Sequence, residues 1–300
     1  MQGIRSSSGL NKLKKIIEIG ETWAREREKE VARFIEEAGN NIVITYSGLG
    51  YSPASILYWI ITTAFPDKNT ALFDSDTIAY YRLPYSKSSS IIHFSTRPDD
   101  PALIRLSDTS RWTNNRLLII TPEPSEVLKE LLRGSPYIQT PSSSNEIITC
   151  FYESMLSLLV GVKIARSRGK RFIRLEKFID EGYGPILDEF FERYRNVTST
   201  ITKYKSIIVS STSLLEPHVH VLIQALRNIG IQASFIPITM LTPLSSENIL
   251  IVATSIEENI VKEKKFKALM NNANVIDFTL NVDPLEAPIY IHLVSMSFLH

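Results

Sequence analysis

The residues best suited to bind an anion lie in a glycine-rich loop at residues 47–52. The loop follows the β-branched run at 42–45 and precedes an apolar stretch at 54–65, which predicts a buried strand, a tight turn and a helix. Gly48 and Gly50 permit the turn and a close backbone approach. A helix N-terminus that points at such a loop offers unpaired N–H groups and the positive end of the helix dipole to an anion.

A second loop of hydroxyl and charged residues, 95–100, follows another apolar strand at 90–95. Because the carboxyl ends of parallel strands lie at one edge of a sheet, we expect the two loops to meet there. We also expect Ser52 to be the N-cap of the helix at 54–65 and Pro53 to occupy its first helical position. The serines could instead serve only as caps. The expected binding residues are Gly48, Gly50, Tyr51, Ser52, Ser95, Thr96, Arg97 and Asp100.

Two other patterns point to cofactors less strongly. Gly48-x-Gly50 followed by Asp74 or Asp76 is similar to a dinucleotide-binding fingerprint, but Pro53 stands where the third glycine belongs. His218 and His220 are two residues apart at a helix start and so do not share a face. We therefore expect neither a nucleotide cofactor nor a metal site.

The composition is that of a globular chain without the excess of positive charge that attracts nucleic acid. The 300 residues are 44% hydrophobic and 22% charged, with a net charge of +1. The single cysteine, Cys150, lies in an apolar run, which favours a buried structural thiol. We see no apolar run near the ~18 residues that span a bilayer and no secretory core at the N-terminus. The chain is expected to be cytoplasmic, and its Ile, Glu and Lys content favours a thermophilic source.

The rest of the first half predicts helices that alternate with strands. Residues 10–38 form an amphipathic helix, broken near Gly20, and residues 147–165 form an apolar helix after a polar loop. Such alternation predicts an α/β fold with a parallel sheet. Further strands are expected at 70–73, 116–121 and 135–139, with helices through 106 and over 124–132.

The second half repeats the opening of the first. When Pro217 is aligned with Pro53, the strand at 206–210 falls on the strand at 42–45, with the same loop length and a helix afterwards. Thr212 and Leu214 replace the two glycines. Strands at 233–237, 249–253 and 274–278 and a final helix from about 284 complete the half. We expect two similar lobes, residues 1–168 and 203–300, joined by helices at 169–202.

Read together, the two loops resemble those of the SIS (sugar isomerase) domain. SIS domains show a Gly-x-Gly/Cys-Gly-Thr-Ser loop and a Ser-x-Ser-Gly-x-Thr loop, which correspond here to residues 47–52 and 95–100. Residues 118–121 and 144–146 match further family positions. The resemblance implies two flavodoxin-like lobes, each a parallel sheet flanked by helices. It also implies a phosphorylated sugar or amino sugar as ligand and a homodimer with the 10–38 or 147–165 helix near its interface.

The chain departs from the family at two points. Arg97, Pro98 and Asp100 replace a serine, a glycine and a threonine of the second loop. An arginine can hold phosphate, but an ionised Asp100 repels it unless Arg97 or a metal neutralises the charge.

The related isomerases carry their catalytic base in a segment that corresponds to residues 237–244, where this chain has neither glutamate nor histidine. The sequence therefore favours a sugar-phosphate-binding protein that has lost the base. The alternative is an aldose–ketose isomerase in which Glu146 or Glu216 serves as base. Glu146 could equally be a first-turn carboxylate that favours the helix dipole.

Overall fold

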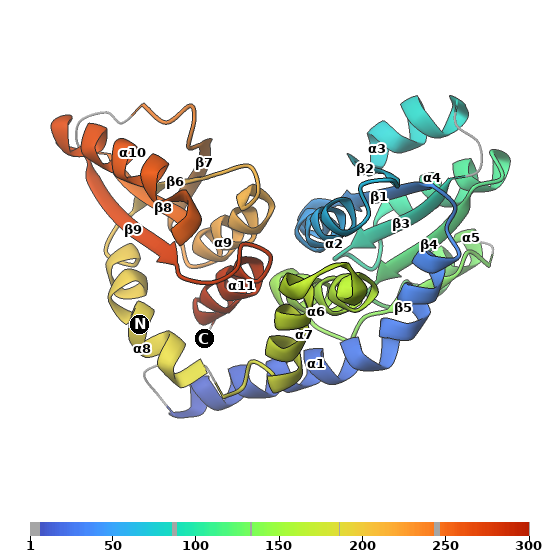
Figure 1. Cartoon of the computed structure of the whole chain (residues 1–300), viewed down its shortest axis with the longest axis horizontal. Coiled ribbons are helices and arrows are strands. Elements are labelled where there is room, and N and C mark those ends of the chain that lie inside the picture. The colour runs from blue at the N-terminus through green and yellow to red at the C-terminus, as the bar shows by residue number, and fades with distance from the viewer. Residues whose placement is uncertain (1–6, 86–88, 133, 186, 243–246, 300) are drawn as a thin grey trace. The chain divides into compact units, whose positions relative to one another are not determined.

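The structure, a computed structural model, describes residues 7–85, 89–132, 134–185, 187–242 and 247–299. Its contacts divide the chain into two compact units (Figure 1). The first lobe comprises residues 16–182, and the second lobe comprises residues 1–15 and 183–300. Helix α7 (Lys170–Glu181) thus groups with the first lobe and α8 (Leu187–Ile201) with the second, whereas the sequence analysis set 169–202 apart.

The first lobe is built on a parallel sheet with the strand order β2-β1-β3-β4-β5. This is the flavodoxin-like order, and its topological switch point lies between β1 and β3. The predicted α/β class and parallel pairing are confirmed. The strands are β1 (Asn41–Ser47), β2 (Asn69–Asp74), β3 (Ser90–Ser95), β4 (Arg116–Thr121) and β5 (Tyr137–Gln139).

Helices cover both faces of this sheet because alternate side chains of each strand point to opposite faces. Val43, Ile91 and Ile119 pack with the helices that follow β3 and β4 in one apolar cluster. The neighbouring residues along these strands are buried as well, and the helices that follow β1 and β5 cover the other face of the sheet (Figure 1). The helices are α2 (Tyr51–Ala64), α4 (Pro101–Trp112), α5 (Glu126–Leu132) and α6 (Glu146–Ala165), with short helical turns at α3 (Ser75–Thr77), η2 (Ile78–Arg82), η3 (Leu83–Tyr85) and η4 (Arg166–Arg168).

The N-terminal helix α1 (Ser7–Glu36) runs through Gly20 without a break, so the predicted interruption is wrong. Gly20 serves packing instead. A Cβ at this position would lie 2.8 Å from Cδ1 of Tyr152 on α6, closer than side chains can approach. The glycine therefore lets α1 and α6 come together, and the helical propensity of its neighbours carries the helix past it.

The second lobe has the parallel strand order β7-β6-β8-β9, which repeats the order of the first four strands of the first lobe. The repeat predicted from the alignment of Pro217 with Pro53 thus has an equivalent strand–turn–helix in each lobe. The elements are β6 (Ser206–Ser211), α9 (Glu216–Asn228), β7 (Gln232–Pro237), β8 (Asn248–Thr254), η5 (Ser255–Glu257), α10 (Glu258–Met270), β9 (Asn274–Leu280) and α11 (Ala287–Ser297).

Helix α6, with its extension to Arg168, is long and apolar enough to cross a membrane, which corrects the expectation that no run has that length. The apolar 18-residue stretch of this helix is 83% buried inside the protein. Burial of this kind is typical of a core helix, and it also removes one reason for a homodimer. The apolar surface of α6 is covered within its own lobe and needs no second chain to shield it.

Glu153 of α6 is completely buried, and its two carboxyl oxygens have no hydrogen-bond partner among the described residues. Burial raises the pKa of Glu153 well above its ordinary value, because the charged form would lose its hydration. The carboxyl is therefore protonated in the folded protein at a pH where the unfolded chain has already released the proton.

We predict that Glu153 lowers stability as the pH rises. Above about pH 4.5 the carboxyl of Glu153 is ionised in the unfolded chain but stays protonated in the folded chain. The free energy of unfolding therefore falls by up to ~1.4 kcal/mol for each pH unit, until the pKa of the folded state is reached. Glu153→Gln removes this titration. In urea titrations at pH 5 and 7, its unfolding free energy should rise relative to wild type at the higher pH. Glu36→Gln, at an exposed position, is the control. Parallel pH curves for Glu153→Gln and wild type would contradict the prediction.

Candidate functional site

The glycine loop after β1 forms a short 3₁₀ turn, η1 (Gly48–Gly50), and α2 begins at Tyr51. Gly50 is the residue before the helix, so the prediction that Ser52 is its N-cap is wrong. Ser52 is fully buried, and its hydroxyl lies 3.5 Å from that of Ser154 on α6. In this structure Ser52 therefore belongs to the packing between α2 and α6.

The two glycines of the loop are required for different reasons. Gly48 has a φ of +53°, in the left-handed region that favours glycine, and a Cβ there would meet open space. Gly50 has an ordinary φ, but a Cβ would lie 2.3 Å from the carbonyl oxygen of Phe94 on β3. Gly50 thus brings the turn against the end of β3. The ring of Tyr51 stacks on that of Tyr46, with the ring centroids 4.3 Å apart.

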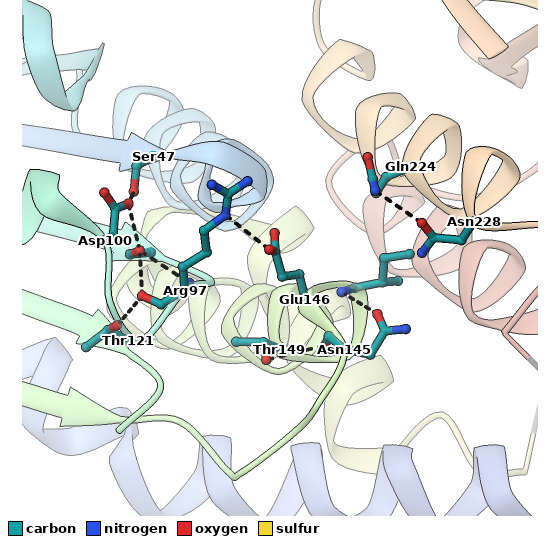
Figure 2. A network of polar contacts seen from close by, with 11 residues as sticks. Ser47, Arg97, Asp100, Thr121, Asn145, Glu146, Thr149, Gln224 and Asn228 are labelled. Carbon is teal, nitrogen blue, oxygen red and sulfur yellow. Dashed lines mark hydrogen bonds and ion pairs between the residues drawn. The ribbon is translucent and has the colours of Figure 1, made fainter. Parts of the chain in front are cut away.

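The loops after β1 and β3 meet at the carboxylate of Asp100 (Figure 2). Parallel pairing places Ser47 opposite Ser95, and both hydroxyls donate to Oδ2 of Asp100, the one from Ser95 at 3.1 Å. Oδ1 accepts the backbone N–H of Ala102 at 2.9 Å, which makes Asp100 the N-cap of α4. The predicted meeting of the two loops is thus present, with a side chain of the protein at its centre.

The charge of Asp100 follows from these bonds. Burial by itself would raise the pKa of Asp100, but the hydrogen bonds from Ser47, Ala102 and Ser95 outweigh it, and the pKa lies below its ordinary value. Asp100 is therefore ionised at neutral pH. His93 on β3 is fully buried, and burial lowers its pKa to about 4 against the attraction of Asp100, so the imidazole is neutral.

A cavity of about 780 Å³ lies at the carboxyl ends of β3, β4 and β5. Arg97 and Glu146 stand in its wall, with Arg97 Nε 3.1 Å from Glu146 Oε1 (Figure 2). Lys129 donates to Glu123 at 2.8 Å and to Glu126 at 2.7 Å. The lining residues are Thr96, Arg97, Pro98, Pro122, Glu123, Pro124, Ser125, Glu126, Lys129, Ser142, Ser143, Ser144 and Glu146.

The cavity brings together only part of the predicted site. Thr96 and Arg97 line it, and so does Glu146, whereas the 48–52 loop, Ser95 and Asp100 do not. The sequence analysis missed Ser125, Lys129 and the serines at 142–144 as site residues. They were detectable in principle, because they follow β4 and β5 and so lie at the same edge of the sheet as the loop after β3.

The other candidates in the first lobe have local roles. Asp74 accepts the backbone N–H groups of Asp76 and Thr77 and caps α3. Cys150 is buried and its thiol donates to the carbonyl oxygen of Leu49 at 3.2 Å. Burial raises the pKa of Cys150 well above its usual value, so a thiolate nucleophile is disfavoured.

In the second lobe, Glu216 is the first residue of α9, and one oxygen lies 3.9 Å from Nε2 of His220. His218 is buried, and burial followed by repulsion from His292 lowers the pKa of His218 well below its ordinary value. The described residues contain no group of three His, Cys, Asp or Glu side chains that could hold a metal.

Residues 237–242 belong to the segment where the resemblance predicts the counterpart of the isomerase base, and the apolar side chains there contribute to the core of the second lobe. Ile238 and Leu241 are buried in an apolar cluster of the second lobe, and Met240 between them is exposed. Residues 243 and 244 of this segment lie outside the described residues.

Comparison with known proteins shows the fold of the chain. No protein-family model matches the sequence, and no curated protein matches it. Among solved structures, the chain is similar to the C-terminal domain of glucosamine-fructose-6-phosphate aminotransferase from Francisella tularensis. The identity is 15%, the TM-score is 0.71, and the match covers 98% of this chain and 96% of that chain.

Two further structures show the same likeness. Tagatose-6-phosphate ketose/aldose isomerase from Escherichia coli has 11% identity and a TM-score of 0.66, covering 97% of this chain and 92% of that one. Glucosamine-6-phosphate deaminase from Thermotoga maritima has 12% identity and a TM-score of 0.67, covering 93% and 92%. The chain therefore has the two-lobe SIS fold that its loops predicted.

Proposed function

We propose that this SIS-fold chain binds a phosphorylated sugar or amino sugar in the cavity at the carboxyl ends of β3, β4 and β5. The observation that carries the proposal is the cavity itself. Its volume of about 780 Å³ is in the range of small-molecule sites, and it lies at the sheet edge where α/β proteins bind ligands.

The polar groups of the wall suit the two ends of such a ligand. The side chain of Arg97 is 62% exposed, and its guanidinium suits a phosphate, which it can contact through two N–H groups. Three carboxylates, Glu123, Glu126 and Glu146, can accept hydrogen bonds from sugar hydroxyls or from an ammonium group. The serines at 142–144 can donate or accept.

The solved structures of similar fold support the same ligand class. The three named above bear names that refer to a fructose, tagatose or glucosamine 6-phosphate. This likeness is one of fold, and the polar side chains of the cavity wall are what indicate the chemistry of the ligand.

We predict that the protein binds glucosamine 6-phosphate and fructose 6-phosphate and binds the unphosphorylated sugars at least tenfold more weakly, because an Arg–phosphate pair would be lost. Isothermal titration calorimetry measures both. Ser144→Leu places an apolar side chain in the cavity wall and should weaken binding about tenfold or more. Ser255→Leu, at an exposed position of the second lobe, should leave the affinity unchanged. Equal affinity for phosphorylated and unphosphorylated sugars would contradict the proposal.

A second function, aldose–ketose isomerisation, is favoured by one observation: the carboxylate of Glu146 lines the cavity. Isomerisation requires a base within hydrogen-bond reach of the C–H group. In the apolar segment described above, Ile238 and Leu241 cannot supply it, and Glu146 already bonds Arg97. We therefore propose a binding protein without conventional isomerase activity.

We expect a turnover below ~1 s⁻¹ with glucose, mannose and glucosamine 6-phosphates, the low end of ordinary enzymes. A coupled assay and deuterium incorporation into fructose 6-phosphate in heavy water measure product formation and proton abstraction separately. Faster exchange would identify a base. Its loss in Glu146→Gln but not in Glu216→Gln would assign that role to Glu146 and restore the isomerase.

The resemblance to SIS proteins also supports a homodimer, with α1 or α6 near the interface. Since α6 is covered within its lobe, the exposed positions of α1 are the better surface for the contact. A cytoplasmic location and a thermophilic source remain predictions from the composition.

We predict a molar mass near twice the 34.0 kDa of the chain in light scattering at micromolar concentration. Replacing the exposed Ile19 of α1 by Lys should shift the mass toward that of the monomer, because a buried charge opposes association. The exposed Ile256, changed to Lys in the same way, is the control. A single species of about 34 kDa in the wild type would reject the dimer.

A further inference from the structure

Three hydrogen-bond donors converge between β1 and β3, and one carboxylate of the protein takes all of them. The hydroxyls of Ser47 and Ser95 donate to Oδ2 of Asp100, and the first free amide of α4, from Ala102, donates to Oδ1. Two hydroxyls and a helix N-terminus at a topological switch point are the donor set that would otherwise hold an external anion.

A phosphate would meet two obstacles at this position. The oxygens of Asp100 occupy the space in front of the donors, and the two negative charges would repel each other at close range. No cation contacts the carboxylate among the described residues, because the hydrogen-bond partners of Asp100 are hydroxyls and an amide. Removing Asp100 would also leave the hydroxyl of Ser47 without this partner in a partly buried place, whereas the hydroxyl of Ser95 would keep its contacts with the backbone N–H and carbonyl oxygen of Arg97.

In the second lobe, too, a carboxylate joins the loops that follow the first and third strands. Thr212, in the loop after β6, donates through its hydroxyl to Oε1 of Glu257, which follows β8. Oε2 of Glu257 accepts the backbone N–H of Thr254 at 2.7 Å. Since β6 and β8 correspond to β1 and β3, each lobe joins the same pair of loops through a carboxylate of its own.

Arg97 is the cationic residue nearest to Asp100 in the sequence, and part of its guanidinium is still able to bind a ligand. Its Nε donates to Glu146, while neither of its terminal amino groups donates to any described residue. Figure 2 shows the guanidinium beside Glu146 and the Asp100 carboxylate on the far side of the loop, beside Ser47. Thr96, the residue before Arg97, also lines the cavity. It is 2% exposed, and its hydroxyl has no partner among the described residues.

We propose that Asp100 is a built-in occupant of the anion position between β1 and β3 and that the phosphate of the ligand binds instead to the terminal amino groups of Arg97 in the cavity. The second half of this statement rests on the proposed function, whereas the first half does not. Ser47 and Ser95 then hold Asp100 and make no contact with the ligand.

The first experiment separates the two positions by calorimetry with glucosamine 6-phosphate. Arg97→Gln should weaken binding about tenfold or more, because the guanidinium is lost. The variant Ser47→Ala should change the affinity less than about threefold, because the hydroxyl of Ser47 bonds Asp100 and does not line the cavity. A large loss in Ser47→Ala with little loss in Arg97→Gln would place the phosphate at the hydroxyls and overturn the proposal.

The second experiment tests Asp100 with inorganic phosphate alone. Asp100→Ser keeps a good N-cap for α4 but removes the charge and opens the space before the donors. It should raise phosphate affinity about tenfold or more over wild type, whereas Asp99→Ser, an exposed neighbour, should not. Asp100→Asn, which keeps the side-chain shape, is the second variant if Asp100→Ser does not fold, and it should give a smaller gain.

The outcomes distinguish the two proposals. A wild type that binds no sugar phosphate, together with a gain of phosphate affinity in Asp100→Ser, would overturn the proposed function and the role of Arg97 but support Asp100 as the occupant. No gain in Asp100→Ser or Asp100→Asn, in folded protein, would overturn the role of Asp100 whatever the wild type binds.

Discussion

The first lobe depends on the parallel pairing of β1 with β3. This pairing sets Ser47 opposite Ser95 and brings the loops after both strands to one point. Asp100 then joins them, since its carboxylate takes both hydroxyls and the first amide of α4. One side chain thereby fixes two loops and the start of a helix, and the hydrogen bonds keep it charged although it is half-buried. The cavity opens on the other side of the same β3 loop.

Close approach of backbones carries the rest of the lobe. Gly50 lets the turn after β1 contact β3, and Gly20 lets α1 contact α6. Gly161 does the same between α6 and α2, where a Cβ would lie 2.7 Å from Cδ1 of Ile60. Small residues at these contacts explain how a helix as apolar as α6 is covered on several sides. The same burial removes the carboxyl of Glu153 from solvent, and the folded protein therefore holds this group in its neutral form.

The two lobes keep a topology and differ in chemistry. Both have the same order of strands, and both join the loops after the first and third strand through a carboxylate. The second lobe has Thr212 and Leu214 in place of the glycines, and its segment after β7 buries Ile238 and Leu241 in an apolar cluster. One fold can thus carry different side chains at corresponding loops.

The sequence by itself determined the elements, the parallel sheets and the duplication, because β-branched runs, glycine turns and the spacing of apolar residues are local signals. It also identified the two loops that meet, since strand ends of a parallel sheet share an edge. It did not determine what the side chains do there. Ser52 is a residue type typical of a helix cap, but its hydroxyl lies near that of Ser154, because after the turn at 48–50 the helix starts two residues earlier than a cap at Ser52 would require.

The tertiary structure decided the partner of each polar group. Asp100 could have repelled or flanked a ligand, and only the register of β1 and β3 shows that it takes the hydroxyls itself. Gly20 has the propensity of a helix breaker, yet the contact with Tyr152 makes it part of a continuous helix. Lys129 and the serines at 142–144 join Arg97 around one cavity because β3, β4 and β5 are neighbours in the sheet; the strand ends predict a shared edge, but the order of the strands, which makes these loops adjacent, is decided by the tertiary structure.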